Sequence, residues 1–493
     1  MSIFRGVISF IASTIIVRFV SLIVQFILGW YLSANDYGIF GMATSLSIFV
    51  SCFQENGLRN FLVQKAASGE EVEGIKNEAL FLGLALSVIS ACLLMVVACF
   101  YAAQTDEPFL IMIALMLSVA GVIAFSVPIL RSQISADLRF SDLAKVDTLR
   151  NSATHLFMIP FALLGFGPMS FVIHRPFIRL MEVYQYRRLL PQCNVMLRVK
   201  EIDFRMVGRL AWQIRWIAFG AVLTALSMKG DYFILGLFVD ARVVGIYFFG
   251  YQLTGAFANL VSGSVFSNVF MPAFSRLNNQ PLRQLERFHR SLLSQLMLCF
   301  PVFFLAAVFV EDCINLLWNY KWSGSVLVAQ LLLLALPLRL CSPLVRALFE
   351  AQGKWRKVAV MIGVNAVGVT SAALIGGMMG SLSAIAISAA IWSVAYGTGV
   401  LFVACRCRIE GNGIDHLVML SIVKVIASYF VFILLYLVAC RQGHLDPSNL
   451  LDTSVYYILG ILVIHLFVLK KEAAVMVRSV VLPLYRKLSG RFL

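Results

Sequence analysis

The sequence predicts an all-α polytopic membrane protein with about 14 transmembrane helices. Hydrophobic residues make up 60% of the chain and charged residues 13%, and the mean hydropathy is +0.88. Soluble domains are about 45–50% apolar and about 25% charged, so this composition excludes a soluble enzyme, a secreted disulfide scaffold and a disordered chain. Apolar runs lie near residues 7–32, 39–60, 79–102, 109–130, 151–166, 169–186, 210–238, 244–271, 291–310, 325–345, 358–379, 382–404, 420–440 and 454–470.

The lysine and arginine residues between these runs set the orientation of the chain. Cytoplasmic loops carry an excess of such residues. With the N-terminus in the cytoplasm, the predicted outer connections hold only Arg242, Lys321 and Arg441. We therefore expect both termini on the cytoplasmic side of the membrane. The net charge of +15 then reflects topology and lipid contacts, and no nucleic acid partner is expected.

The predicted outer connections are short, which argues against an enzyme. The longest are residues 311–324 and 441–453. Membrane polysaccharide polymerases and ligases need a larger outer loop that carries acids, histidine or arginine. The sequence also contains no phosphate loop, nucleotide fingerprint or spacing of metal ligands, so no cofactor and no metal are expected.

An internal repeat predicts two similar bundles. Residues 27–40 align without gaps on residues 234–247. The identical pairs include Gly29 with Gly236, Ala34 with Ala241 and Gly38 with Gly245. We expect two pseudo-symmetric six-helix bundles at 1–200 and 201–410, followed by two extra C-terminal helices and a basic cytoplasmic tail at 411–493. Parallel repeats are typical of transporters that bind substrate between the halves.

The start of the chain and three predicted inner loops resemble one family. These segments are residues 31–49, 55–64, 130–146, 270–290 and 348–359. They resemble bacterial polysaccharide-export flippases of the Wzx type, in the MATE-like flippase superfamily. The resemblance covers about residues 1–410 and implies alternating access by two six-helix bundles. It implies a polyprenyl-diphosphate-linked oligosaccharide as substrate, for exopolysaccharide, capsule or O-antigen assembly, with polysaccharide polymerase and chain-length machinery as further partners.

Charged residues inside the predicted spans are the candidate site, because charge in a membrane is costly and usually functional. Arg18 and Gln25 share one polar stripe of the first span, where a guanidinium can bind phosphate oxygens. Arg175 and Arg179 lie one turn apart in the sixth span. They line a cationic cavity, or Arg179 pairs with Glu182 and Arg175 reaches the membrane surface.

The seventh and eighth spans supply the other candidates. Arg215 is a candidate for the cavity, or it marks the inner interface beside two tryptophans. Asp231 is a candidate for ion coupling, with an interfacial Lys229–Asp231 pair as the alternative. Tyr251 and Asn259 are candidate sugar contacts, with helix–helix hydrogen bonding as an equally good explanation. The rival functions are an ion-coupled multidrug antiporter, a polymerase or ligase, and a scaffold that transports nothing.

Overall fold

The computed structural model describes residues 2–52, 58, 62, 73–137, 139–191, 198, 202–261, 270, 274–277, 279–405, 416–441, 450–464 and 468–470. These residues divide into two compact units. Unit 1 comprises Met1–Gln252 and Ile362–Ile385, and unit 2 comprises Leu253–Met361 and Ala386–Leu493. The domain boundaries near residues 200 and 410 stay a prediction, since they follow the repeat and not spatial compactness.

Every regular element in the described ranges is helical, as predicted. Unit 1 contains α1 (Ser2–Tyr31), α2 (Ala34–Cys52), η2 (Glu73–Ile75), α4 (Lys76–Thr105), α5 (Phe109–Ile123), η3 (Ala124–Ser126), α6 (Val127–Ala136), α7 (Phe140–Leu156), α8 (Met158–Leu163), η4 (Gly167–Phe171), α9 (Arg175–Leu189) and α10 (Phe204–Leu235). Unit 2 contains α13 (Pro281–Trp318), η7 (Ser323–Ser325), α14 (Val326–Arg339), α15 (Cys341–Ala351), α18 (His416–Arg441) and α19 (Leu450–Val463). Parts of α11 (Ala241–Val261), α16 (Trp355–Met378) and α17 (Leu382–Cys405) belong to each unit.

The protein is a multi-pass membrane protein. Within the described ranges, 8 helices are long and apolar enough to cross a membrane. Their exposed surface is rich in large apolar side chains, such as Val96 and Phe100 on α4, which are 67% and 64% exposed. Such a surface requires lipid as its solvent. The finer count of about 14 spans stays a prediction.

Local sequence explains two of the tight connections of unit 1. Between α1 and α2, the backbone N–H of Ser33 donates to Asp36 Oδ2 over 2.8 Å, and the N–H of Asp36 donates to Ser33 Oγ over 3.2 Å. This reciprocal pair satisfies the first donors of α2. Between α8 and η4, Gly165 and Gly167 have φ of 80° and 53°, which glycine adopts without steric cost. The predicted break between the fifth and sixth spans is therefore present.

The start of α7 differs from the prediction. The sequence predicts a span from residue 151, whereas α7 begins at Phe140. The missed turns carry Asp142, Lys145, Asp147 and Arg150, which lower the local hydropathy. These charges form ion pairs within unit 1, so the helix tolerates them.

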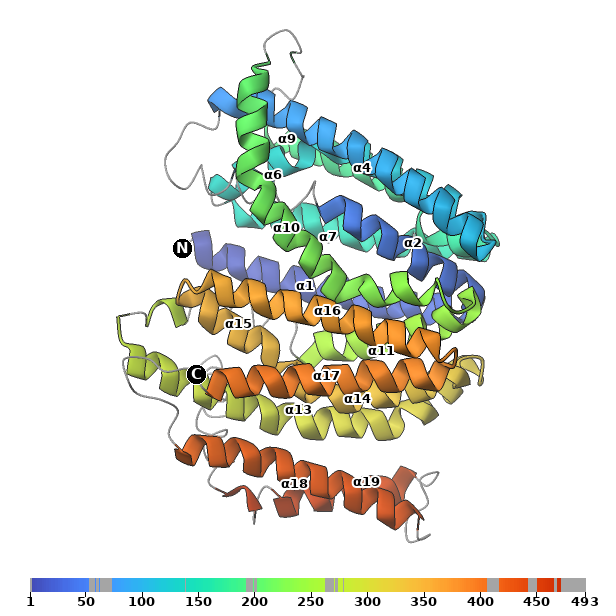
Figure 1. Cartoon of the computed structure of the whole chain (residues 1–493), viewed down its shortest axis with the longest axis vertical. Coiled ribbons are helices and arrows are strands. Elements are labelled where there is room, and N and C mark those ends of the chain that lie inside the picture. Colours follow the sequence, from blue (N-terminus) through green and yellow to red (C-terminus); the bar gives the residue numbers. More distant parts are fainter. Residues whose placement is uncertain are drawn as a thin grey trace, which may run out of the picture. The chain divides into compact units, whose positions relative to one another are not determined.

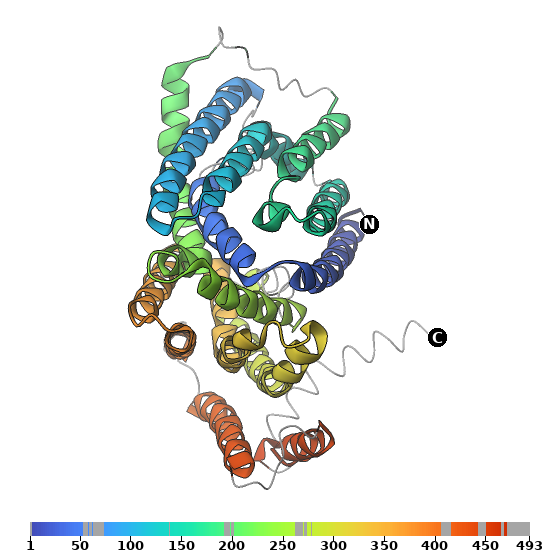
Figure 2. The same cartoon turned by 90° about the vertical axis from the view of Figure 1, so that its right-hand side faces the viewer.

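Aromatic side chains join α18 and α19 to α13 in unit 2. Figure 1 shows α14 running alongside α13, and α18 and α19 are the orange and red pair in Figure 2. The ring of Phe304 lies 5.5 Å from those of Phe432 and Tyr436 on α18, and 5.8 Å from that of Tyr457 on α19. The two additional helices therefore pack as one aromatic layer on the middle of α13.

Candidate functional site

Arg18 and Gln25 lie on α1, which packs along α7 and α8. Both side chains are half-buried, whereas Ile16 and Phe19 are more than half exposed. Gln25 Nε2 is buried and has no hydrogen-bond partner within the described ranges. An unsatisfied buried amide is costly, so this nitrogen is available to a polar ligand. The predicted polar stripe is thus set apart from the exposed apolar face of α1.

Arg175 begins α9 and faces an aromatic pair. Its Nε donates to the carbonyl oxygen of Phe171 over 3.2 Å, and its guanidinium carbon lies 5.8 Å from the centre of the Phe40 ring. The rings of Phe40 and Phe171 stack with their centres 4.0 Å apart. A cation over an aromatic face gains a favourable electrostatic contact with the ring. Arg175 is half-buried in this position.

Arg179 belongs to a cluster of five ionised groups from three helices. This arginine cluster consists of Arg131 on α6, Asp147 and Arg150 on α7, and Arg179 and Glu182 on α9. Glu182 is fully buried and accepts from Arg179 over 2.7 Å and from Arg150 over 3.2 Å. Arg131 binds Asp147 through two contacts of 2.7 and 2.5 Å. The structure thus contains the Arg179–Glu182 pair that the sequence left open, and places Arg150 on the same carboxylate.

The charge balance of the arginine cluster is positive. Three guanidinium groups face two carboxylates, and the arginine side chains are 18–24% exposed while Glu182 is 0% exposed. Glu182 is therefore enclosed, whereas Asp147, at 14% exposed, reaches the edge of the cluster together with the three arginines.

A second charged region lies on α10 and α11. The Lys229 Nζ lies 4.9 Å from the centre of the Tyr232 ring, 5.4 Å from that of Phe248 and 5.9 Å from that of Tyr251. Asp231 is 5% exposed and accepts from the backbone N–H of Tyr232 over 3.0 Å and from Tyr247 Oη over 3.1 Å. Tyr251 thus lies beside a cation, and Asp231 is held by a tyrosine hydroxyl.

Sequence reasoning missed Lys229 as a site residue. It treated the lysine only as the interfacial partner of Asp231, and the structure in addition surrounds Lys229 with aromatic rings. Part of the signal was present, because Lys229 and Tyr232 are three residues apart on a helix and share a face. The contribution of Phe248 and Tyr251 depends on how α11 packs, which the local sequence does not encode.

Arg215 lies at a more exposed place. Its guanidinium carbon is 3.5 Å from the centre of the Trp212 ring and 5.4 Å from that of Trp216. Both tryptophans are about two-thirds exposed, at 67% and 68%. Tryptophan and arginine together are typical of a membrane–water interface. The remaining candidate, Asn259, is on α11, and its side chain lies outside the described residues.

These features define a class of protein. The chain is a multi-pass helical membrane protein that holds arginine and lysine side chains within its units, where charge is costly and usually functional. Residues 27–327 match the family of polysaccharide biosynthesis proteins. The chain belongs to this family, as the resemblance at its start predicted.

Solved structures show the same fold at low sequence identity. The lipid II flippase MurJ, in an inward closed conformation, matches 96% of this chain and 100% of its own, with a TM-score of 0.70 and 14% identity. An inward-facing multidrug resistance transporter of the MATE family matches 80% of this chain and 97% of its own, with a TM-score of 0.56 and 13% identity. No curated protein matches by sequence. The fold is thus that of MurJ and the MATE transporters.

Proposed function

We propose that the protein flips polyprenyl-diphosphate-linked oligosaccharides from the inner to the outer leaflet of the bacterial cytoplasmic membrane. The single observation that carries this proposal is the combination of a polysaccharide biosynthesis family match with a MurJ-like fold over 96% of the chain. In this proposal both termini are cytoplasmic, and the protein is a transporter and not an enzyme. The glycan serves exopolysaccharide, capsule or O-antigen assembly.

The charged groups of unit 1 support an anionic substrate. Two features suit the diphosphate: Arg175, which lies over the Phe40 ring, and the arginine cluster with its net positive charge. Guanidinium groups bind phosphate oxygens through paired hydrogen bonds. Arg18 and Gln25 supply a cation and an unsatisfied amide on α1. Tyr251 and Asn259 are the proposed sugar contacts, and Arg215 completes the set of cations at the inner end.

An ion-coupled multidrug antiporter is the second candidate, because a MATE transporter has a similar fold. Such a protein exports cations and requires acids that its substrate can reach. In the described part of the spans, Asp147 and Glu182 are already engaged by arginines. We therefore favour the flippase and assign Asp231 the narrower role of ion coupling.

Transport in proteoliposomes tests the proposal. A fluorescent polyprenyl-diphosphate oligosaccharide is followed across the bilayer for wild type, Arg18→Ala, Arg175→Ala and Asp231→Asn, at matched incorporation. We expect each arginine variant to lose at least about tenfold in rate, because a charged hydrogen bond to phosphate is lost. Arg290→Ala is the control, since Arg290 lies on an exposed ion pair with Glu286.

The outcomes separate the candidate functions. Transport by wild type that both arginine variants abolish supports a flippase with a cationic site. Asp231→Asn should remove the response to an imposed proton or sodium gradient and keep downhill flipping. Wild type that moves organic cations and flips no lipid across several glycans would establish the antiporter instead.

A further inference from the structure

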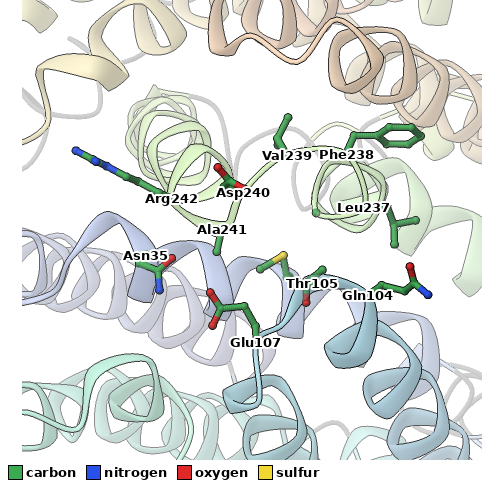
Figure 3. Close-up of a pocket in the computed structure, with 12 residues that line it drawn as sticks. Asn35, Gln104, Thr105, Glu107, Leu237, Phe238, Val239, Asp240, Ala241 and Arg242 are labelled. Atoms are coloured by element: carbon green, nitrogen blue, oxygen red, sulfur yellow. The ribbon is translucent and has the colours of Figure 1, made fainter.

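A polar pocket of about 410 Å³ lies within unit 1 where three helical connections meet (Figure 3). The connection between α1 and α2 contributes Asn35. The end of α4 and the turn to α5 contribute Gln104, Thr105 and Glu107, and the connection between α10 and α11 contributes Gly236–Arg242. This volume is within the range of roughly 300–1,000 Å³ for small-molecule sites. In the proposed orientation, with both termini in the cytoplasm, these connections lie on the outer side of the membrane.

Hydrogen bonds fix the walls of this outer pocket. Tyr101 Oη on α4 donates to the carbonyl oxygen of Phe233 on α10 over 2.8 Å, which joins two of the walls. The backbone N–H of Val239 donates to Leu235 over 3.0 Å. A Cβ on Gly236 would overlap both Tyr101 Oη and Met42, so the backbone packs closely at the base. The pocket is therefore preorganised and does not depend on a flexible loop.

The side chains that line the pocket offer both hydrogen-bond acceptors and donors. The Asn35 amide donates to the Glu107 carboxylate, and Figure 3 shows the two groups next to each other. Thr105 Oγ1 donates to the carbonyl of Tyr101 over 2.9 Å, which leaves its oxygen free to accept. Gln104 and Asp240 add an exposed amide and an exposed carboxylate. Such groups match a ligand with several hydroxyls.

The charge of the pocket disfavours an anionic ligand. Glu107 and Asp240 line it, and Asp36 and Asp106 lie close enough to act electrostatically on Glu107. Burial, and then these two acids, raise the pKa of Glu107. Arg242, the one cation among the described residues of the lining, extends away from the carboxylates in Figure 3. A diphosphate is repelled here, whereas an uncharged polyol is not.

We propose that this outer pocket binds the uncharged sugar residues of the exported oligosaccharide after the glycan has reached the outer side. The proposal rests on the proposed function for the source of the glycan. The sugar hydroxyls donate to Glu107 and Asp240, and the amides of Asn35 and Gln104 donate to the sugar oxygens. The pocket is separate from the arginines that suit the diphosphate. The sugar end of the substrate therefore contacts carboxylates and amides, and its diphosphate end contacts arginines.

Binding is measured on the full-length protein in nanodiscs by saturation-transfer NMR. The probes are glucose, galactose, N-acetylglucosamine and glucuronate. We expect signals from the neutral sugars and a weaker signal from glucuronate, because its carboxylate faces the acids of the pocket. Glu107→Ala removes an acceptor, and Asn35→Trp fills the pocket without removing a carboxylate. Each should weaken neutral-sugar binding about tenfold or more.

Glu311→Gln is the matched control. Glu311 is an exposed carboxylate on α13 of unit 2 and does not line the pocket. It should bind sugars as wild type does. The proposal fails if wild type binds none of the neutral sugars, or if Asn35→Trp binds them unchanged.

A transport arm distinguishes the exported glycan from other polysaccharide outside the membrane. If the pocket serves the exported glycan, Asn35→Trp slows the flipping of a lipid that carries a full oligosaccharide more than one that carries a single sugar. Lost sugar binding with unchanged flipping of both lipids would overturn that assignment. If the wild-type protein flips neither lipid, the proposed function is contradicted but the sugar-binding proposal is not. Sugar binding is measured by NMR, which does not require transport.

Discussion

Gly38 and Gly245 occupy equivalent positions in the two copies of the repeated segment, and each lies against the backbone of the other copy. A Cβ at Gly38 would overlap the carbonyl oxygen of Ala241, and a Cβ at Gly245 would overlap that of Ala34. Ala34 and Ala241 are themselves equivalent in the repeat, so the contact is reciprocal. The first turns of α2 and α11 therefore cross at backbone distance, which only small residues permit.

Alanine at Gly38 should destabilise the protein, although alanine is the better helix former. The new methyl group meets backbone and not a side chain, so no change of rotamer relieves the overlap. Overpacking of this kind lowers the free energy of unfolding by about 1–3 kcal/mol. The measurement is the midpoint of unfolding in mixed micelles, which should be lower for Gly38→Ala than for wild type. Gly255→Ala is the control, because no atom of the described residues lies within 4 Å of its Cβ position. Equal midpoints for Gly38→Ala and Gly255→Ala would show that the crossing is not tightly packed.

The sequence predicted the membrane class, the helical fold and the family, because each depends on local composition or on motifs. It also located the break at Gly165 and Gly167, where turn chemistry is local. It misplaced the start of α7, since hydropathy counts Asp147 and Arg150 as polar whereas the fold pairs them with residues far along the chain. The surroundings of Lys229 could not be predicted for the same reason. Such sites form at contacts between helices, and a hydropathy pattern does not indicate which helices pack against each other.

Glu182→Gln should be strongly destabilising. Glu182 is fully buried and holds both Arg150 and Arg179, so the substitution removes the carboxylate that these two arginines share, while Arg150 keeps Asp147 at 3.6 Å. Removal of one partner from a buried ion pair costs about 3–5 kcal/mol. The measurement is denaturant unfolding of wild type and variant under the same micelle conditions.

The control for Glu182→Gln is Glu286→Gln. Glu286 pairs with Arg290 on the exposed start of α13, where both side chains are 58% exposed. Exposed pairs contribute about 0–1 kcal/mol, so this variant should unfold close to wild type. Similar losses for the two variants would mean that the arginine cluster is solvated and does not hold α7 to α9.

The stability of unit 1 should respond to the ionisation of Glu107. Burial raises the pKa of Glu107 above its usual 4.5. The hydrogen bond from Asn35 lowers this pKa, and the negative charges of Asp106 and Asp36 raise it. A carboxyl with a raised folded-state pKa stabilises the protein when protonated, and that stability is lost as the pH rises through the folded-state pKa. The melting temperature of wild type, relative to Glu107→Gln, should therefore increase as the pH falls from neutral. A pH-independent difference would show that Glu107 is fully solvated.

The aromatic layer on α13 should depend on Pro301. Proline has no N–H, so the carbonyl of Met297, four residues earlier, has no helical donor. Tyr429 Oη on α18 donates to that carbonyl over 3.4 Å, and Tyr457 Oη on α19 donates to the carbonyl of Pro301. The ring of Tyr429 also stacks on Phe300 at 5.3 Å. The proline thus exposes an acceptor that α18 satisfies.

A double-mutant cycle tests this coupling between α13 and α18. Tyr429→Phe keeps the stacked ring and removes the hydroxyl, which should cost about 0.5–1.5 kcal/mol in the free energy of unfolding. In a Pro301→Ala background the helix supplies its own N–H to Met297, so the same substitution should cost clearly less. Phe300→Leu, which leaves the hydrogen bond intact, provides the comparison for lost stacking. If Tyr429→Phe costs the same with and without Pro301, α18 is held to α13 by its aromatic rings alone.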